Sequence, residues 1–140
     1  MPEGLPDLPP VFAPVIRLRE AGDAMARAVA EAPRHGAGTL VWVGAFEGVE
    51  AAVVLEAEQT LAEARPALLA AASAFADALG THGPAEIPVA IAWPATVKVN
   101  GAVVGAARLV APPDADDQKT PDWLGVGGEA RFAFPEQHRP

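Results

Sequence analysis

The sequence contains no cysteine and no tyrosine, and its one serine is Ser73. The absence of cysteine excludes disulfides, thiolate metal sites and a cysteine nucleophile. Ser73 lies in the middle of an expected helix and outside any Gly-x-Ser-x-Gly context, so a hydrolase nucleophile is not expected. His82 and His138 lie in polar segments without a metal-ligand partner at usable spacing, and both are expected to be solvated.

Positive charge is scarce as well. Ten Lys and Arg residues stand against 18 Asp and Glu residues, for a formal net charge of −8. Phosphate contacts need clustered Lys and Arg, so a nucleic-acid partner is excluded. No apolar run approaches the length of a membrane span, and residues 1–10 lack the basic and apolar regions of a signal peptide. We therefore expect a cytoplasmic protein with no membrane partner.

The length and the composition of the chain indicate one globular domain. A chain of 140 residues with 51% hydrophobic residues can bury a single core. Residues 1–14 contain five prolines, which forbid a helix and favour an extended arm. The domain is expected to cover 15–134, followed by a tail over 135–140.

The first half of the domain alternates strands with one helix. Asp23 is placed to cap that helix and Pro33 lies just past its expected end. Val-rich runs on both sides have the length of buried strands. The expected elements are a strand over 15–18, a helix over 23–32, and strands over 39–46 and 49–55.

The second helix is the clearest element of the pattern. Thr60 and Glu63 match a capping box, and large apolar residues follow at helical spacing. Pro66 means that the helix either begins at the residue before it or bends there. The expected helix covers 60–79, and Gly80 is the expected C′ residue.

The last part of the chain is expected to form strands of the sheet. Asn100-Gly101 joins two β-branched runs, the strongest short-range signal for a two-residue hairpin. A strand over 89–93 precedes this hairpin, and a polar loop over 112–122 leads to a last apolar run from Trp123. The order is roughly β-α-β-β-α-β-β-β, which predicts an α+β domain with a mixed, largely antiparallel sheet flanked by helices.

Several local motifs have a plain interpretation that outweighs a functional one. Gly36 and Gly38, beside Arg34 and His35, suggest a phosphate loop, but they precede a strand where such a loop precedes a helix. The aspartates of 114–117 lack the glycine and closing glutamate of a calcium loop, so a solvated loop is favoured.

Three glycines within 125–128 indicate close approach to a neighbouring strand or a ligand. Core packing is the default, and a shared pocket wall the alternative, for Trp42, Trp93 and Trp123.

The order of these pieces carries a resemblance to a known family. Residues 12–134 resemble the catalytic domain of the biotin and lipoate protein ligases, most of all the divergent bacterial biotin/lipoate A/B ligase-like branch. Trp93-Pro94 corresponds to the start of the family's Trp-Pro-Asn-Asp motif, Asn100-Gly101 to its Asn-Gly turn, and Gly105 to the glycine that follows the turn. "LGVGGEARF" is similar to the family's final Gly-rich strand, and "GAGTLVW" occupies the place of its Gly/Arg-rich loop and Trp.

The resemblance implies a fold and an activity. Ligases of this family bind an acid and ATP, form an acyl-adenylate and pass the acyl group to a lysine of a carrier domain. It therefore implies ATP with magnesium and biotin or lipoate as ligands, if the chain is active. Ligases of this kind also carry a C-terminal extension, and a chain that stops at "PEQHRP" is expected to be a truncated form or to need a partner.

The departures from the family pattern concern its chemistry. The resemblance aligns the family's catalytic lysine with Val103 and its Asn-Asp pair with Ala95 and Thr96. Losing a cation from an adenylation site costs about a hundredfold or more in rate, by analogy with oxyanion donors. By strand alternation, Lys98 is expected to point to the opposite sheet face from Val103 if the register is regular.

Two further regions depart from the family pattern. The Arg-rich loop keeps only Arg34 and His35, and the family's Ser-Thr-Asn region at the first helix reads Ala21-Gly22-Asp23. The leading hypothesis is a catalytically degenerate ligase-like domain that keeps a pocket for an acyl ligand or a surface for a carrier domain or partner subunit. The alternatives are an active ligase that uses a relocated cation (Arg34, Arg108 or Lys98) and a structural or homodimer-forming module.

The pocket candidates combine the matched and the departing positions, and no metal ligand is among them. A small acyl ligand such as biotin, lipoate or an octanoate-like chain would contact them. They are Arg34, His35, Gly36, Gly38, Trp42, Trp93, Pro94, Thr96, Lys98, Val103, Gly105 and Arg108.

Overall fold

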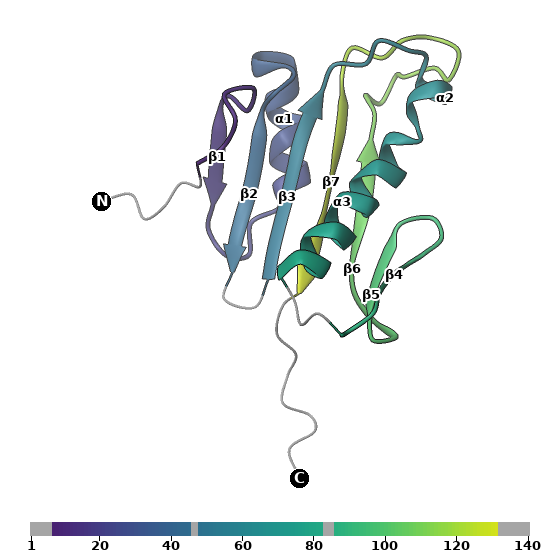
Figure 1. The fold of residues 1–140 in the computed structure, drawn as a ribbon. Helices are drawn as coiled ribbons and strands as arrows, with labels where there is room; N and C mark the ends of the chain where they lie inside the picture. The colour runs from purple at the N-terminus through teal and green to yellow at the C-terminus, as the bar shows by residue number, and fades with distance from the viewer. Residues whose placement is uncertain (1–6, 46–47, 83–85, 132–140) are drawn as a thin grey trace.

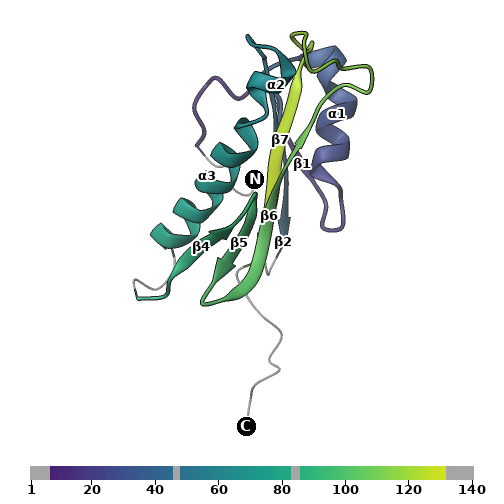
Figure 2. The ribbon, with the colours of Figure 1, turned by 90° about the vertical axis from the view of Figure 1, so that its right-hand side faces the viewer.

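The computed structural model describes residues 7–45, 48–82 and 86–131. Within these ranges the chain forms one seven-stranded sheet with helices on both faces (Figures 1 and 2). The elements are β1 (Val15–Leu18), α1 (Ala24–His35), β2 (Leu40–Ala45), β3 (Gly48–Leu55), α2 (Leu61–Ala64), α3 (Ala67–His82), β4 (Val89–Ala92), β5 (Thr96–Val99), β6 (Ala102–Val110) and β7 (Leu124–Arg131).

The strand order across the sheet is β1-β2-β3-β7-β6-β5-β4. β1 pairs with β2 in parallel, and the other neighbouring pairs are antiparallel. The last strand in the sequence therefore lies in the middle, where it joins the β1–β3 half to the β4–β6 half. The expected α+β fold with a mixed, largely antiparallel sheet is confirmed.

The central strand β7 is nearly free of side chains where the helices approach it. A Cβ atom on Gly125 would lie 3.0 Å from the Met25 Sδ of α1, and one on Gly128 would lie 3.0 Å from the Phe75 Cε2 of α3. Residues 125 and 128 point to opposite faces because strand side chains alternate. The two helices thus cover opposite faces of the sheet, as Figure 2 shows.

Each face has its own core. On the α1 face, small and β-branched residues of the helix and of β2 and β3 pack together with Trp123. On the α3 face, the smaller cluster contains Ala72, Ala95 and Ala107, with Leu68 packed against it. The β7 glycines were expected to allow close approach of a neighbouring strand or a ligand, and in the structure neighbouring strands and helices lie against them.

Helix α1 is longer than expected. Asp23 caps it as predicted, because its side chain accepts a hydrogen bond from the N–H of Ala26 (3.0 Å). The predicted end before Pro33 is wrong, since the helix continues to His35. Proline removes one donor, and near the C-terminus the last turn still closes through the Gly36 N–H bond to the Ala32 carbonyl (2.9 Å).

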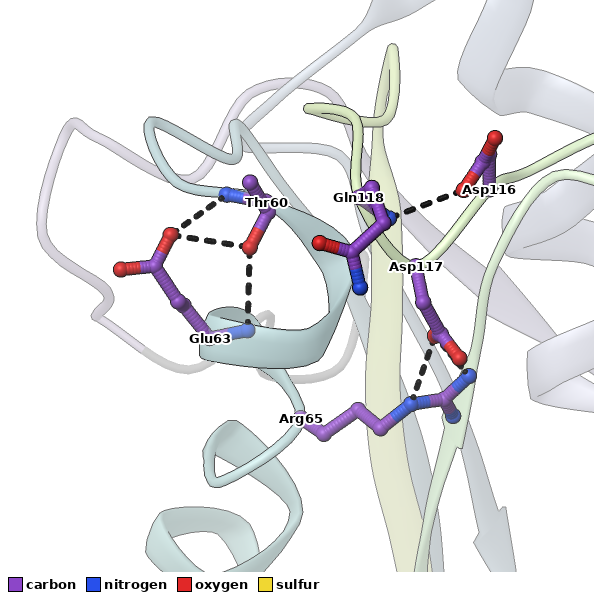
Figure 3. A network of polar contacts seen from close by, with 6 residues as sticks. All are labelled: Thr60, Glu63, Arg65, Asp116, Asp117 and Gln118. Carbon is purple, nitrogen blue, oxygen red and sulfur yellow. Dashed lines mark hydrogen bonds and ion pairs between the residues drawn. The ribbon is translucent and has the colours of Figure 1, made fainter.

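The second helical region is broken into two helices. Thr60 and Glu63 form the predicted capping box at the start of α2 (Figure 3). The chain then breaks at Arg65-Pro66 before α3 begins, so the helix is interrupted at the proline, where a bend was one of the two alternatives. Arg65 turns its guanidinium to the Asp117 carboxylate at 2.6 Å, which ties the break to the 112–122 loop. Gly80 lies inside α3, which runs to His82, and is not a C′ residue.

The hairpin at Asn100-Gly101 is confirmed. Both residues have positive φ, 51° and 82°, and Val99 pairs directly with Ala102. The hairpin contributes two strands, so four strands follow the second helical region; each of the four runs was expected, although the rough order counted three. The strand expected over 89–93 ends at Ala92, and Trp93 begins a turn.

The ends of the domain follow the predicted outline in part. Residues 7–14 contain no helix; a turn brings the Phe12 N–H to the Pro9 carbonyl, and the Ala13 N–H donates to the Gly38 carbonyl. The last strand covers Leu124–Arg131. The tail and the expected strand residues 46 and 132–134 lie outside the described residues. Among those described, no helix is both long and apolar enough to cross a membrane.

Gly127 of the central strand β7 and Gly80 of helix α3 offer a matched test of this packing. A Cβ on Gly127 would collide with the Ala51 carbonyl of β3, whereas a Cβ on Gly80 meets nothing within 4 Å. Gly127→Ala should lower the free energy of unfolding by about 1–3 kcal/mol. Gly80→Ala should raise it by about 0.5–1 kcal/mol, because alanine is the better helix former. Urea denaturation measures both, and equal stability of Gly127→Ala and the parent would contradict the packing of β7 against β3.

Candidate functional site

A row of five side chains crosses the sheet in front of the start of α1. Val43 pairs with Glu50, Glu50 with Glu129, Glu129 with Ala106, and Ala106 with Thr96, so the row spans β2, β3, β7, β6 and β5. Residues directly opposite on neighbouring strands point to the same face of a sheet. The row forms the floor of an open cavity of about 620 Å³.

The walls of this cavity come from one loop and from parts of three of these strands. The loop before α1 closes one side, the hairpin strand β6 closes the other, and the ends of β3 and β7 lie at the rim. Besides the floor, the lining contains Glu20, Ala21, Gly22, Gly48, Val49, Val103, Val104, Gly105, Ala130 and Arg131.

Glu50 fixes the cavity to helix α1. Its Oε2 accepts a hydrogen bond of 2.6 Å from the N–H of Ala24, the first residue of the helix. This N–H is one of the donors that a helix leaves without an intrahelical partner. A carboxylate at this end also interacts favourably with the helix dipole. Glu50 is therefore held in place, and so is the first turn of α1 above the cavity.

The charge of the cavity is negative. Its lining holds the carboxylates of Glu20, Glu50 and Glu129 and the guanidinium of Arg131, which together carry a formal charge of −2. Glu50 and Glu129 are direct cross-strand partners. Like charges placed directly opposite each other destabilise a sheet. Arg108 lines a small adjoining cavity together with Glu50 and Glu129, so a guanidinium lies next to this pair and offsets part of the repulsion.

A bulge shapes the hairpin side of the cavity. Val97 pairs with Gly105 but Lys98 pairs with Val103, so Val104 is an additional residue in β6. Val103 is 61% exposed at the cavity, while Val104 is buried. The expectation that Lys98 and Val103 point to opposite faces is wrong, because a two-residue turn makes them direct partners. Lys98 thus lies beside the position of the family's lysine.

The predicted site residues fall into several places. Thr96, Val103 and Gly105 line the cavity, together with the Ala21-Gly22 segment that replaces the family's Ser-Thr-Asn. Ala95 is buried on the other face, in the small cluster beneath α3. Only the second position of the family's Asn-Asp pair therefore reaches the cavity.

The Arg34 segment lies at the opposite end of α1. Arg34 and His35 are in the last turn of the helix, where they approach the buried Glu31 carboxylate at 3.3 and 3.7 Å. Gly36 and Gly38 follow, and the Gly38 backbone bonds to Ala13 and Val54. The cavity is lined by residues that precede α1, so these four candidates do not join it.

The remaining candidates are also outside the lining. Trp42 lies on the other face of the sheet, with the Arg17 guanidinium 5.1 Å from its ring. Trp93 is 81% exposed beside Pro94 in the turn between β4 and β5, so core packing is wrong for it. Arg108 lies 4.0 Å from the Asp23 carboxylate at the start of α1.

The aspartates of the polar loop serve the fold. The Asp116 carboxylate accepts a hydrogen bond from the N–H of Gln118 (2.9 Å), and Asp117 pairs with Arg65 (Figure 3). Among the residues that the structure describes, no group of three or more His, Asp or Glu side chains has the arrangement of a metal site.

The sequence interpretation missed the acidic floor. Glu50 and Glu129 each interrupt an apolar strand, in "GVEAAVVL" and "LGVGGEAR", and a lone carboxylate within such a strand was the available signal. The two are 79 positions apart in the chain, and only the pairing of β3 with β7 brings them together.

Solved structures of other proteins share this fold. A crystal structure of a biotin protein ligase-like protein of unknown function from Silicibacter sp. TM1040 has a TM-score of 0.81 and 29% identity over 94% of this chain. The biotin protein ligase of Leishmania major, in complex with biotinyl-5-AMP, has a TM-score of 0.56 and 19% identity over 94% of this chain, and so supports the fold alone.

The chain is shorter than both of these relatives, since it covers 57% and 61% of their lengths. A search among proteins with curated descriptions found no match. A model of the biotin/lipoate A/B protein ligase family matches residues 8–139, nearly the whole chain. The protein therefore belongs to the biotin/lipoate A/B protein ligase family.

Proposed function

We propose that this domain binds an acyl-type ligand in the cavity in front of α1 and does not adenylate it. The observation that carries the proposal is the lack of a cation where the resemblance places the catalytic lysine, in a cavity whose charged lining residues are mainly carboxylates. Val103 occupies the position that the resemblance aligns with the catalytic lysine, and three carboxylates line the same space.

The chemistry of adenylation explains why these groups matter. Attack of a carboxylate on the α-phosphate of ATP builds up negative charge, which an active site stabilises with cations and hydrogen-bond donors placed around it. Loss of one such donor lowers the rate by about 10²–10³-fold. A lining with a formal charge of −2 opposes the binding of ATP as well as its reaction.

The shape of the cavity supports binding of an acyl chain. A volume of about 620 Å³ lies within the ordinary range of small-molecule sites. Val43, Val103 and Ala106 give it aliphatic surface, which suits a biotin, lipoate or octanoate-like chain. The Leishmania relative with the same fold binds biotinyl-5-AMP, which is consistent with an acyl ligand here.

Lys98 favours a second candidate, an active ligase with a relocated cation. It is the direct cross-strand partner of Val103, on the same face of the sheet. The lysine side chain is long and flexible, so its ammonium group can approach a ligand held at Val103. Arg34 and Arg108, the other cations considered, are engaged near Glu31 and Asp23.

The first prediction separates the two candidates. The purified domain should give no ATP–pyrophosphate exchange above background with biotin, lipoate or octanoate, because the cavity has no cation at Val103. The measurement is exchange of labelled pyrophosphate into ATP, with an active ligase of the family as positive control. Exchange that falls at least tenfold in Lys98→Ala, and is unchanged in Arg34→Ala, would establish the active ligase instead.

The second prediction tests the cavity as the binding site. An octanoyl ligand at a hundred times its Kd should raise the free energy of unfolding by about 2.7 kcal/mol. Ala106→Leu places a larger side chain on the floor and should abolish this gain, while it changes the stability of the free protein by about 1 kcal/mol or less. Thermal denaturation with and without ligand is the measurement.

The matched control is Ala70→Leu, the same change at an exposed position of α3. This variant should keep the full stabilisation by ligand. Equal stabilisation of both variants would place the ligand elsewhere.

A further inference from the structure

We propose that the outer edge of β4 binds a second copy of this chain. In this dimer the two β4 strands pair antiparallel about a two-fold axis between the two Ala90 residues, so that the two sheets become one. Among the described strands, β4 is the last on its side of the sheet and pairs with β5 alone (Figure 1). The inference goes beyond ligand binding, because no residue of β4 lines the cavity in front of α1.

The outer edge of β4 presents backbone groups that β5 does not use. The N–H of Asn100 donates a hydrogen bond of 2.9 Å to the Pro88 carbonyl, so the backbone of Pro88 faces β5. Backbone groups alternate between the two sides of an antiparallel strand, so those of Val89 and Ile91 point away from β5. Pro88 therefore removes no donor from the outer edge, which stays open to a further strand.

This edge lacks the charged side chains that commonly protect an edge strand. Native proteins block such edges with charges, prolines, bulges or a covering segment. The strand at the other end of the sheet, β1, carries Arg17, whereas β4 reads Val-Ala-Ile-Ala. No charged residue lies between Glu86 and Lys98 in the sequence. A second copy therefore meets no like charge on the strand itself, although each copy has a formal net charge of −8.

The exposed apolar side chains of this region are arranged symmetrically about Ala90. Ile91 is 41% exposed. Ile87 and Trp93, which are 37% and 81% exposed, lie at equal distances in the sequence before and after Ala90. An antiparallel pair centred on Ala90 places Ile91 opposite Val89 of the second copy and Trp93 next to Ile87 of the second copy. Aromatic and β-branched side chains opposite each other stabilise a strand pair.

The same register satisfies the backbone. Val89 of one copy and Ile91 of the other exchange N–H and carbonyl bonds, and these are the groups that point away from β5. A shift by one residue would bring together side chains from opposite faces of the sheet. Helix α3 packs against β6 and β7 as well as β4, so its body is set back from the edge and leaves room for the second sheet. The edge is thus complementary to itself, as an isologous interface requires.

The size of this contact predicts a weak dimer. A covered indole buries about 150–250 Å², and only one short strand on each side joins the pairing. Stable interfaces bury about 1,200–2,000 Å² in total. We therefore expect a dissociation constant in the micromolar range, and a monomer at lower concentrations.

Sedimentation equilibrium from low micromolar to near-millimolar concentration tests the interface. The parent should show a reversible monomer–dimer equilibrium. Ile91→Lys places a charge on the edge and should raise the dissociation constant by about tenfold or more. Trp93→Ala should do the same, because it removes an exposed indole and leaves the core intact. Val11→Lys is the matched control: it changes another exposed β-branched residue, in the N-terminal arm, and should leave the equilibrium unchanged.

Single cysteines test the register, since the natural chain has none. Opposite residues outside the hydrogen-bonded pairs have Cα atoms about 4.5 Å apart, which a disulfide can bridge. Ala90→Cys should therefore give a disulfide-linked dimer under mild oxidation. In the control Ala92→Cys, on the same strand and face, the two cysteines would lie about 14 Å apart. This variant should stay unlinked.

A parent that remains monomeric over the whole concentration range would overturn the proposal. A dimer that neither Ile91→Lys nor Trp93→Ala weakens would place the interface elsewhere on the molecule. Equal cross-linking of Ala90→Cys and Ala92→Cys, or none in Ala90→Cys, would refute the pairing about Ala90. If Ile91→Lys does not fold, Trp93→Ala and the two cysteine variants decide the question. None of these results depends on whether the cavity binds an acyl ligand.

Discussion

The three glycines in the middle of β7 are the constraint on which the rest of the fold depends. Gly125 and Gly128 let Met25 of α1 and Phe75 of α3 come close to opposite faces of one strand. Gly127 lies so close to the Ala51 carbonyl of β3 that no Cβ fits between them. The two halves of the sheet and both helices meet at this strand, and the cavity begins where its glycines end and Glu129 follows.

The site follows from this arrangement. Because β7 lies between β3 and β6, side chains that are far apart in the sequence form one row from Val43 to Thr96. Glu50 connects this row to the first turn of α1 through the Ala24 N–H. The Asn-Gly hairpin and the start of α1 lie on either side of the cavity, and the charged side chains that line it are those of Glu20, Glu50, Glu129 and Arg131.

Local signals in the sequence predicted the elements well and their partners poorly. The Asn100-Gly101 turn and the Thr60–Glu63 capping box were predictable because short-range bonds define them. The ends of the helices were not, since Pro33 costs little in a last turn and Gly80 is tolerated inside α3. The Glu50–Glu129 contact depends on the pairing of β3 with β7, which no local pattern specifies. The face of Lys98, in contrast, follows from the predicted two-residue turn, which pairs it with Val103.

The half of the sheet formed by β1, β2 and β3 has a face that no described helix covers, and Arg17 has a particular consequence there. Its guanidinium lies over Trp42, 5.1 Å from the ring. A cation over an indole is attracted by the ring, and its aliphatic stem shields apolar surface while the charged end remains in water. Arg17 thus shields part of an apolar face that no described helix covers and places a positive charge there, which limits the tendency of an open sheet to aggregate.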